Sequence, residues 1–241
     1  MKPTIIHTSL MTTAAMIALS GCGNSKQTEA EQQRQEWLDS LNDSVALYQK
    51  QIETTTAQLS DVQNEVGRMV GDFDYVSNPR EVEGYYIYKG WKGRYPLSVT
   101  GLVARVSEDE RFELIATLSG THFNQIAVSA DGETVSSDIV PHDQALNYRA
   151  GNLDRVCFTG AKADSIGMLI AQHESLAITT AFLEEKRTAG FQLPADQKQM
   201  VAATWRLYDM QKKAHLLEKE IPRLSGKISA CRRIMDANDS I

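Results

Sequence analysis

Aromatic and basic side chains are concentrated in residues 84–96, and their types are suited to ligand binding. Strand alternation places Tyr86 and Tyr88 on one face, and Trp91 and Tyr95 follow in the adjoining turn. Tyrosine and tryptophan combine an apolar ring with a polar atom, so such a surface can bind a sugar or a protein. The segment is therefore a candidate binding patch. The alternative is a packed edge strand with its turn.

A second candidate lies in the polar segment 142–151, which reads as a loop between strands. Its hydrogen-bonding side chains are His142, Asp143, Asn147, Tyr148 and Arg149. Loops of this kind on a rigid β scaffold are common binding surfaces. The adjacent His142 and Asp143 are potential metal ligands, but two ligands are too few for a metal site. We therefore predict either a binding loop or a structural connection here, with no metal and no cofactor.

Motifs for catalysis are missing from the sequence. It contains no Gly-x-Ser-x-Gly elbow, no His-Glu-x-x-His pair, no phosphate-binding Walker loop and no GxGxxG turn after a strand. The formal net charge of −6 at pH 7 also disfavours binding to nucleic acid. These observations favour a non-enzymatic protein that has no nucleic-acid partner.

Two long segments that must position these residues have apolar side chains at alternating steps of three and four. The first series runs from Leu38 to Met69 and is interrupted by Thr55, and the second runs from Met200 to Met235. This spacing is typical of a coiled-coil stripe. The sequence therefore predicts two long helical arms, one near each end of the chain.

The two arms are opposite in charge, which indicates how they associate. Residues 23–72 hold four basic and nine acidic side chains, whereas residues 194–241 hold nine basic and six acidic ones. Copies of one arm would repel each other, and the two different arms would attract. We therefore predict an antiparallel two-helix coiled-coil stalk within one chain, formed by arms at 32–72 and 194–237. A homo-oligomeric coiled coil is the alternative.

Between the arms, residues 80–190 change to short β-rich runs separated by turn residues. Strands are expected at 83–89, 98–106, 112–118, 125–128, 134–140, 156–159 and 176–183. One short helix is expected at 163–173. The sequence thus predicts an α+β chain whose head is mainly β, either a sandwich or an open barrel, with one short helix.

The N-terminal segment has the layout of a secretory signal peptide, with Lys2, a mostly apolar run and small residues before Cys22. The tetrapeptide Leu19-Ser20-Gly21-Cys22 resembles the lipobox of bacterial lipoproteins. That resemblance implies removal of residues 1–21 and attachment of a diacylglycerol, with acyl chains such as palmitate, to the thiol of Cys22. Gly23 stands where aspartate often signals retention in the inner membrane, which favours the outer membrane. The alternative is an ordinary signal peptide.

These elements together predict a lipoprotein of the bacterial cell envelope. Cys22 anchors it to the outer membrane, residues 22–31 form a tether, and the stalk presents the head to a protein or glycan that the sequence does not identify. A monomer is compatible with this arrangement. One alternative is an adaptor or assembly factor of an envelope complex that uses its coiled coil as the interaction surface. A second is an enzyme acting on glycans or the cell wall, which no motif supports.

Overall fold

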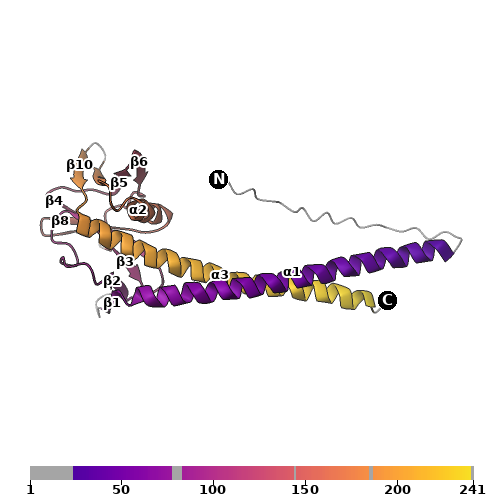
Figure 1. Cartoon of the computed structure of the whole chain (residues 1–241). Coiled ribbons are helices and arrows are strands. Elements are labelled where there is room, and N and C mark those ends of the chain that lie inside the picture. The colour runs from indigo at the N-terminus through magenta and orange to yellow at the C-terminus, as the bar shows by residue number, and fades with distance from the viewer. Residues whose placement is uncertain (1–23, 78–82, 144, 185–186, 240–241) are drawn as a thin grey trace.

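The computed structural model describes residues 24–77, 83–143, 145–184 and 187–239, and it is an α+β protein with two antiparallel sheets (Figure 1). Helix α1 (Asn24–Val70) precedes the strands, and helix α3 (Ala195–Asp239) follows them. Cys22 and the predicted signal peptide lie outside the described residues. None of the helices in the described ranges combines the length and apolarity required to cross a bilayer.

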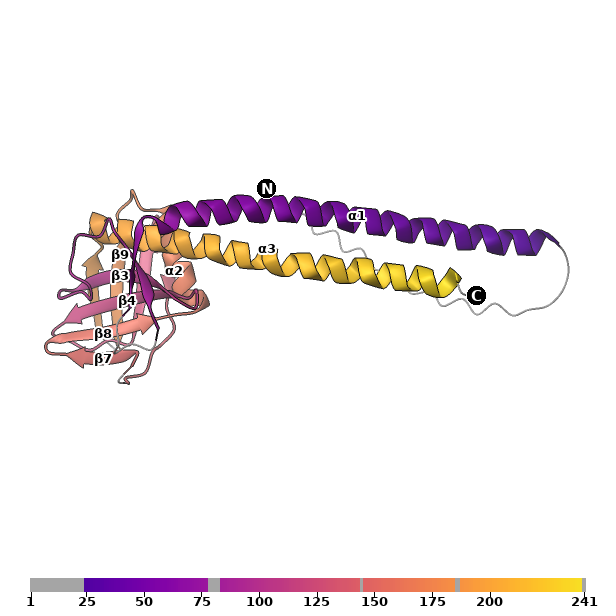
Figure 2. The ribbon, with the colours of Figure 1, turned by 90° about the horizontal axis from the view of Figure 1, so that it is seen from below.

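Helices α1 and α3 lie side by side and run in opposite directions (Figures 1 and 2). Val45 and Val62 of α1 are buried, as are Leu224 and Ile228 of α3, and all four belong to the apolar series expected from the sequence. Burial of apolar area is the dominant favourable contribution to such packing. The two series therefore face each other within one chain.

Polar contacts cross between the same two helices. Gln63 Nε2 donates a hydrogen bond of 3.0 Å to Glu218 Oε1. Further along, the ammonium group of Lys227 lies 5.0 Å from the centre of the Tyr48 ring. Such contacts at exposed positions contribute little energy individually, but they agree on the direction in which the helices pass each other.

The start of α1 corrects the predicted tether, because residues 24–31 are helical. This stretch contains neither proline nor glycine and includes alanine, glutamate and glutamine, which favour helix. Adding residues to an existing helix is far easier than nucleating one. A segment without apolar periodicity can therefore extend a helix that is nucleated and packed further along the chain.

The larger sheet has the strand order β1-β2-β3-β4-β8-β7, and all neighbours are antiparallel. Its strands are β1 (Phe73–Val76), β2 (Tyr85–Tyr88), β3 (Gly101–Ser107), β4 (Phe112–Ser119), β7 (Asn147–Ala150) and β8 (Leu153–Phe158). The smaller sheet has the order β10-β9-β5-β6 and is also antiparallel. Its strands are β5 (Gln125–Ala130), β6 (Glu133–Ser136), β9 (Thr179–Glu184) and β10 (Arg187–Gln192).

Each strand expected from the sequence overlaps an observed strand, and the expected short helix overlaps α2 (Ala161–Gln172). The sequence did not indicate β1, β7 and β10. Strand β7 corrects the prediction of a continuous loop at 142–151. All three are edge strands, which pair on one side only and carry few buried apolar side chains. They therefore lack the alternating apolar pattern by which strands are recognised.

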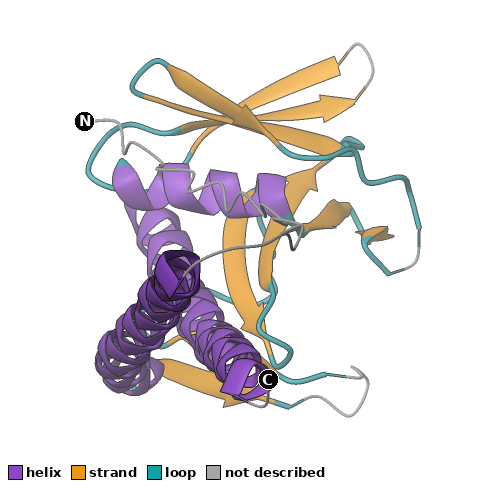
Figure 3. Ribbon diagram, turned by 90° about the vertical axis from the view of Figure 1, so that its right-hand side faces the viewer, coloured by secondary structure: helices purple, strands orange, loops and turns teal. Residues whose placement is uncertain are grey.

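The main core joins both sheets to α2 and to the first turns of α3. It includes Phe112 and Leu114 of β4, Ile126 of β5, Phe182 of β9, Ile166 of α2 and Val201 of α3. Figure 3 shows α2 between the smaller sheet and the long helices. Because Val201 and its neighbours Met200 and Ala202 are buried in the head, the predicted second arm begins inside the head.

Candidate functional site

A group of ionisable side chains lies where the segment after β4 meets the β7–β8 hairpin. It contains His122, His142, Arg149 and Asp154 and is called here the His122 cluster. His122 Nδ1 lies 2.7 Å from Asp154 Oδ2, and Arg149 Nη1 lies 3.1 Å from His122 Nε2. Arg149 Nε lies 3.8 Å from Asp154 Oδ1. The His142 ring approaches His122 edge to face, with 6.3 Å between the ring centres.

The β7–β8 hairpin positions the two charged groups of this cluster. Arg149 and Asp154 are directly opposite each other in the antiparallel register, so their side chains lie on the same face. Gly151 has a φ of 65°, which glycine adopts without strain and which allows the tight turn. The N–H of Gly120 donates to the Asn152 carbonyl at 3.0 Å, and this bond holds the segment that carries His122 against the hairpin.

The contact with Arg149 defines the role of one ring nitrogen of His122. A guanidinium group can donate but cannot accept, so His122 Nε2 is the acceptor in the contact with Arg149. Both carboxylate oxygens of Asp154 are buried and have no hydrogen-bond partner among the described residues. The Asp154 side chain is 3% exposed, compared with 50% for His122. Within the described residues, neither contact of the ring is a hydroxyl or thiol, so the cluster is not arranged as a nucleophile and base.

Asp143, from the predicted loop, has a structural role. Its Oδ1 accepts hydrogen bonds from the N–H groups of Ala145, Leu146 and Asn147, at 2.8, 2.5 and 3.2 Å. The hydrogen bonds from Leu146, Asn147 and Ala145, in that order of size, lower the pKa of Asp143 below its ordinary value of 3.8. This carboxylate therefore organises the backbone that leads into β7.

We expect the turn after Asp143 to open in acid. Because the pKa is lower in the folded chain, the carboxylate stabilises the turn fully above about pH 3.8, and this contribution is lost as the pH falls through the lower folded value. The amide resonances of Ala145, Leu146 and Asn147 should shift together in an NMR titration. In Asp143→Asn the amide oxygen can still accept but does not titrate, so the same shifts should be absent. Equal titration of both proteins would contradict this assignment.

The remaining residues of the predicted loop point elsewhere. Asn147 is buried, and its Nδ2 donates to the Val140 carbonyl at 2.8 Å. The Tyr148 hydroxyl accepts from Arg155 Nη1 at 2.9 Å. Of the five residues singled out in this segment, the structure therefore brings His142 and Arg149 together in the His122 cluster.

Sequence reasoning missed His122 and Asp154. They are far apart in the chain, and the fold of the β4–β5 connection onto the hairpin brings them together. One signal was present. In β8, Asp154 alternates in phase with Val156 and Phe158, which are buried in the main core. A charged residue on an otherwise apolar strand face indicates a buried carboxylate with a partner.

The predicted aromatic patch is divided between two apolar clusters. Tyr86 and Tyr88 pack against a cluster that includes Leu207 of α3. The Tyr88 ring lies 5.7 Å from Phe73, and the Tyr86 ring lies 5.3 Å from Tyr75, measured between ring centres. Strand β2 lies between β1 and β3, so it is not the edge strand considered in the alternative. These rings fasten β2 to its neighbours and to α3.

Trp91 and Tyr95 belong to the second apolar cluster, together with Leu97. The Tyr95 ring lies 5.6 Å from that of Tyr85, and burial raises the pKa of Tyr95 above its ordinary value. Trp91 Nε1 is buried and has no hydrogen-bond partner among the described residues. All four rings of the patch thus have packing roles, and their use as a binding surface stays a prediction.

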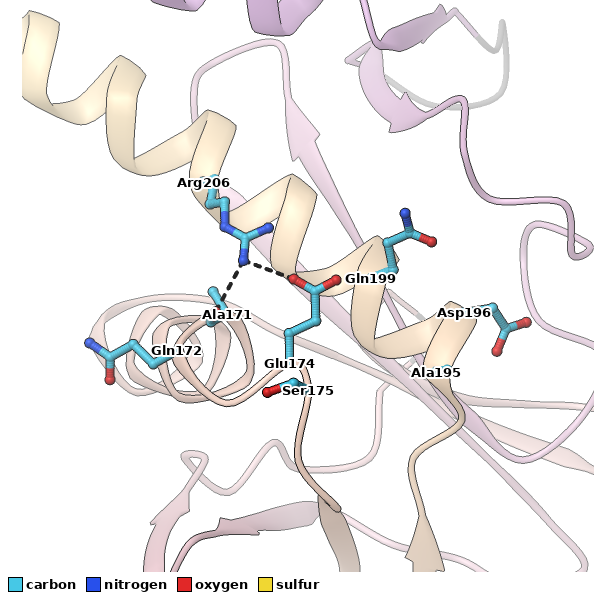
Figure 4. A pocket seen from close by; sticks show the side chains of 8 residues that line it. All are labelled: Ala171, Gln172, Glu174, Ser175, Ala195, Asp196, Gln199 and Arg206. Carbon is cyan, nitrogen blue, oxygen red and sulfur yellow. Dashed lines mark hydrogen bonds and ion pairs between the residues drawn. The ribbon is translucent and has the colours of Figure 1, made fainter.

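An open pocket of about 620 Å³ lies between the end of α2 and the start of α3 (Figure 4). Arg206 Nη2 donates to the Ala171 carbonyl at 3.1 Å and to Glu174 Oε2 at 2.8 Å. Figure 4 shows Arg206 and Glu174 pointing toward each other, with Asp196 pointing away. None of these residues was predicted from the sequence to form a site. Their ion pair satisfies the charged groups internally, which is typical of a structural contact.

Among the described residues, no group of three or more His, Cys, Asp or Glu side chains is arranged to hold a metal ion. No protein-family model, curated protein or solved structure matches the chain.

Proposed function

We propose that this protein is a lipid-anchored lipoprotein of the bacterial envelope that holds a β-rich head at the far end of an antiparallel coiled-coil stalk. Its role is binding or scaffolding, not catalysis. The anchor is the diacylglycerol on Cys22, as the lipobox resemblance implies, and Gly23 favours the outer membrane. The partner at the head is a protein or a glycan.

One observation carries this proposal: the N-terminal end of α1 and the sheets lie at opposite ends of the paired helices (Figure 1). The helix begins at Asn24, two residues after the lipobox cysteine. Its 47 residues span roughly 70 Å at about 1.5 Å per residue. A lipid at Cys22 would therefore leave the head far from the membrane surface. A stalk of this length is useful when the partner is not in the membrane.

A second candidate function assigns partner binding to the paired helices instead of the head. In an adaptor or assembly factor, the exposed surface of the paired helices would contact the partner. The side chains of Leu216 on α3 and Ile139 in the head are both 62% exposed. The head and the paired helices therefore each have an exposed apolar residue at which contact with a partner can be tested.

Photo-cross-linking in intact cells separates the two functions. A photoreactive amino acid is placed at Ile139 in one variant and at Leu216 in the other, and cross-linked products are identified by mass spectrometry. We expect a specific product from the Ile139 position and background from the Leu216 position. Products from Leu216 alone would favour the adaptor. Absence of products from both positions, repeated with probes at other exposed head residues, would contradict a binding role.

A further inference from the structure

We propose that one face of the paired helices α1 and α3, at the end away from the sheets, binds a second copy of this chain (Figures 1 and 2). This surface, called here the distal face, is made of two strips of side chains. The α1 strip is Trp37, Ser40, Ser44 and Leu47, and the α3 strip is Ala230, Ile234 and Ala237. In the dimer, the α1 strip of each copy packs on the α3 strip of the other.

The two strips lie on one face because of their place beside the apolar series. Trp37 and Leu47 each come one residue before a member of the α1 series, and Ile234 comes one residue before a member of the α3 series. One residue turns an α-helix by about 100°, so all three lie on the same rotational side of their series. Because the helices run in opposite directions, that side is the same face of the pair.

A contact between residues on the other side of each series agrees with this assignment. Gln63 and Glu218 each come one residue after a member of their series. They meet across the two helices, with 3.0 Å between Gln63 Nε2 and Glu218 Oε1. Residues that follow the series therefore share one face of the pair, and residues that precede it share the opposite face.

The strips are also at the same height along the pair. The Arg34 guanidinium donates to the Asn238 carbonyl, and the ammonium group of Lys227 lies 5.0 Å from the centre of the Tyr48 ring. Residues 34–48 of α1 therefore run alongside residues 227–238 of α3. Both strips fall inside these ranges, so they form one continuous surface.

The large side chains of the distal face are exposed in a single chain. The exposed fraction is 44% for Trp37, 54% for Leu47 and 45% for Ile234. Isolated apolar side chains are common on protein surfaces, whereas contiguous apolar patches mark interaction sites. Among the described residues of α1 and α3, Leu216 is a further exposed large apolar side chain. It lies roughly 27 Å along α3 from Ile234, beyond the charged Lys227, so it is outside the distal face.

The two strips are complementary in size when a second copy is laid on the face. In an antiparallel pairing of one copy's α1 with the other's α3, Trp37 lies opposite Ala237. Two to three turns further on, Leu47 lies opposite Ala230. Ile234 falls between these two contacts, against the serines of the α1 strip. Each large side chain therefore meets small ones, as helix packing at close distance requires.

Charge complementarity selects α3 of the second copy, and not its α1, as the helix that α1 meets. Residues 34–48 contain one basic and three acidic side chains, whereas residues 227–238 contain three basic and one acidic. Two α1 segments would repel each other, and α1 and α3 attract. At the rim of the face, Asp43 and Arg233 are exposed, and each comes two residues before a member of its series. Asp43 of each copy would therefore face Arg233 of the other.

This pairing requires a two-fold axis that runs along the paired helices. The axis places α1 of each copy over α3 of the other and makes the interface isologous, so every contact occurs twice. It also brings the N-terminal ends of both α1 helices to the same end of the dimer. Two lipid anchors in one membrane, as in the proposed function, need this orientation. Anchoring also raises the effective concentration of the copies, so a small interface suffices.

Photo-cross-linking between two differently tagged copies of the full chain, produced in the same bacterial cells, tests the interface. A photoreactive amino acid replaces Leu47 in one copy. We expect a product that carries both tags, with the link mapped by mass spectrometry to residues around Ala230 of the other copy. The matched control has the same amino acid at Ala46, which is exposed and lies on the opposite face because it follows Val45. Absence of a two-tag product from Leu47, or equal yields from both positions, would overturn the proposal.

Charge reversal at the rim tests which helices meet. Asp43→Arg in both copies should lower the yield of the two-tag product about twofold to tenfold, because each dimer then has two like-charge contacts. Arg233→Asp in both copies should do the same. When one copy carries Asp43→Arg and the other carries Arg233→Asp, opposite charges face each other at both contacts, so the yield should recover. Failure to recover, or a link that maps to α1 of the second copy, would overturn the proposal.

Incorporation of labelled fatty acid, measured on the same samples, separates this inference from the proposed anchor. A two-tag product without label would support the interface and contradict the anchor. Labelled chains without a two-tag product would contradict the interface and leave the anchor supported.

Discussion

Replacing Cys22 by serine is expected to abolish incorporation of labelled fatty acid into the protein. The lipobox resemblance assigns the acylated thiol to this residue, and serine has no thiol. Each acyl methylene buried in a bilayer contributes about 0.8 kcal/mol, and two chains on one residue hold a protein far more durably than a single chain. The measurement is the labelled band in cells fed with a fatty acid analogue. The labelled band should fall to background. When the cell extract is separated into an aqueous and a detergent phase, the protein should no longer be found in the detergent phase.

The matched control is the same change at another cysteine. Cys231 lies on α3, and Cys231→Ser should keep both the label and the partition into detergent. If Cys22→Ser still carried the label, the lipobox assignment would be wrong, and the N-terminal segment would be an ordinary signal peptide. If neither variant carried label, the loss would not be specific to Cys22, and the assignment of the acylated thiol to Cys22 would be contradicted.

The long elements were predictable because their patterns extend over many residues. The α1 series from Leu38 to Met69 keeps alternating steps of three and four residues over several turns, so one polar interruption at Thr55 does not hide it. The structure buries Thr55, as it does Val45 and Val62 of the same series. The edge strands were not predictable in the same way. Asn147 and Arg149 in β7 are polar, and their strand geometry is fixed by pairing with β8, which local sequence does not encode.

The candidate site was even harder to predict from local sequence than the edge strands. Types of side chain were enough to select His142 and Arg149, since both lie in a polar segment beside a proline. Their partners came from other parts of the chain, and the hairpin register together with the Gly120–Asn152 contact brings them into reach. The aromatic segment was selected for the same reason as the polar one. Its rings serve packing instead, because β2 lies next to the helices and needs large apolar contacts there.

The second large effect is expected on stability, when a buried side chain is removed from the junction between the head and the two long helices. Leu207 of α3 is fully buried and packs with Phe73 of β1 and Val106 of β3. The last turns of α1 contribute Met69 and Val70 to the same cluster. Leu207→Ala would leave a cavity where both helices meet the larger sheet, and such changes cost about 2–5 kcal/mol. Because the total free energy of unfolding of a native protein is about 5–15 kcal/mol, this loss would be a large fraction of the total.

Urea unfolding followed by circular dichroism measures the effect, with midpoint and slope determined separately. The control is Leu216→Ala on the same helix, where the side chain is 62% exposed, and its change should stay within about 0.5 kcal/mol. Equal midpoints for the two variants would contradict the junction described above. A lower midpoint with an unchanged slope in Leu207→Ala would mean that head and helices still unfold together. A lower slope would mean that the junction alone couples them, because the sheets and the paired helices would then lose their structure in separate steps.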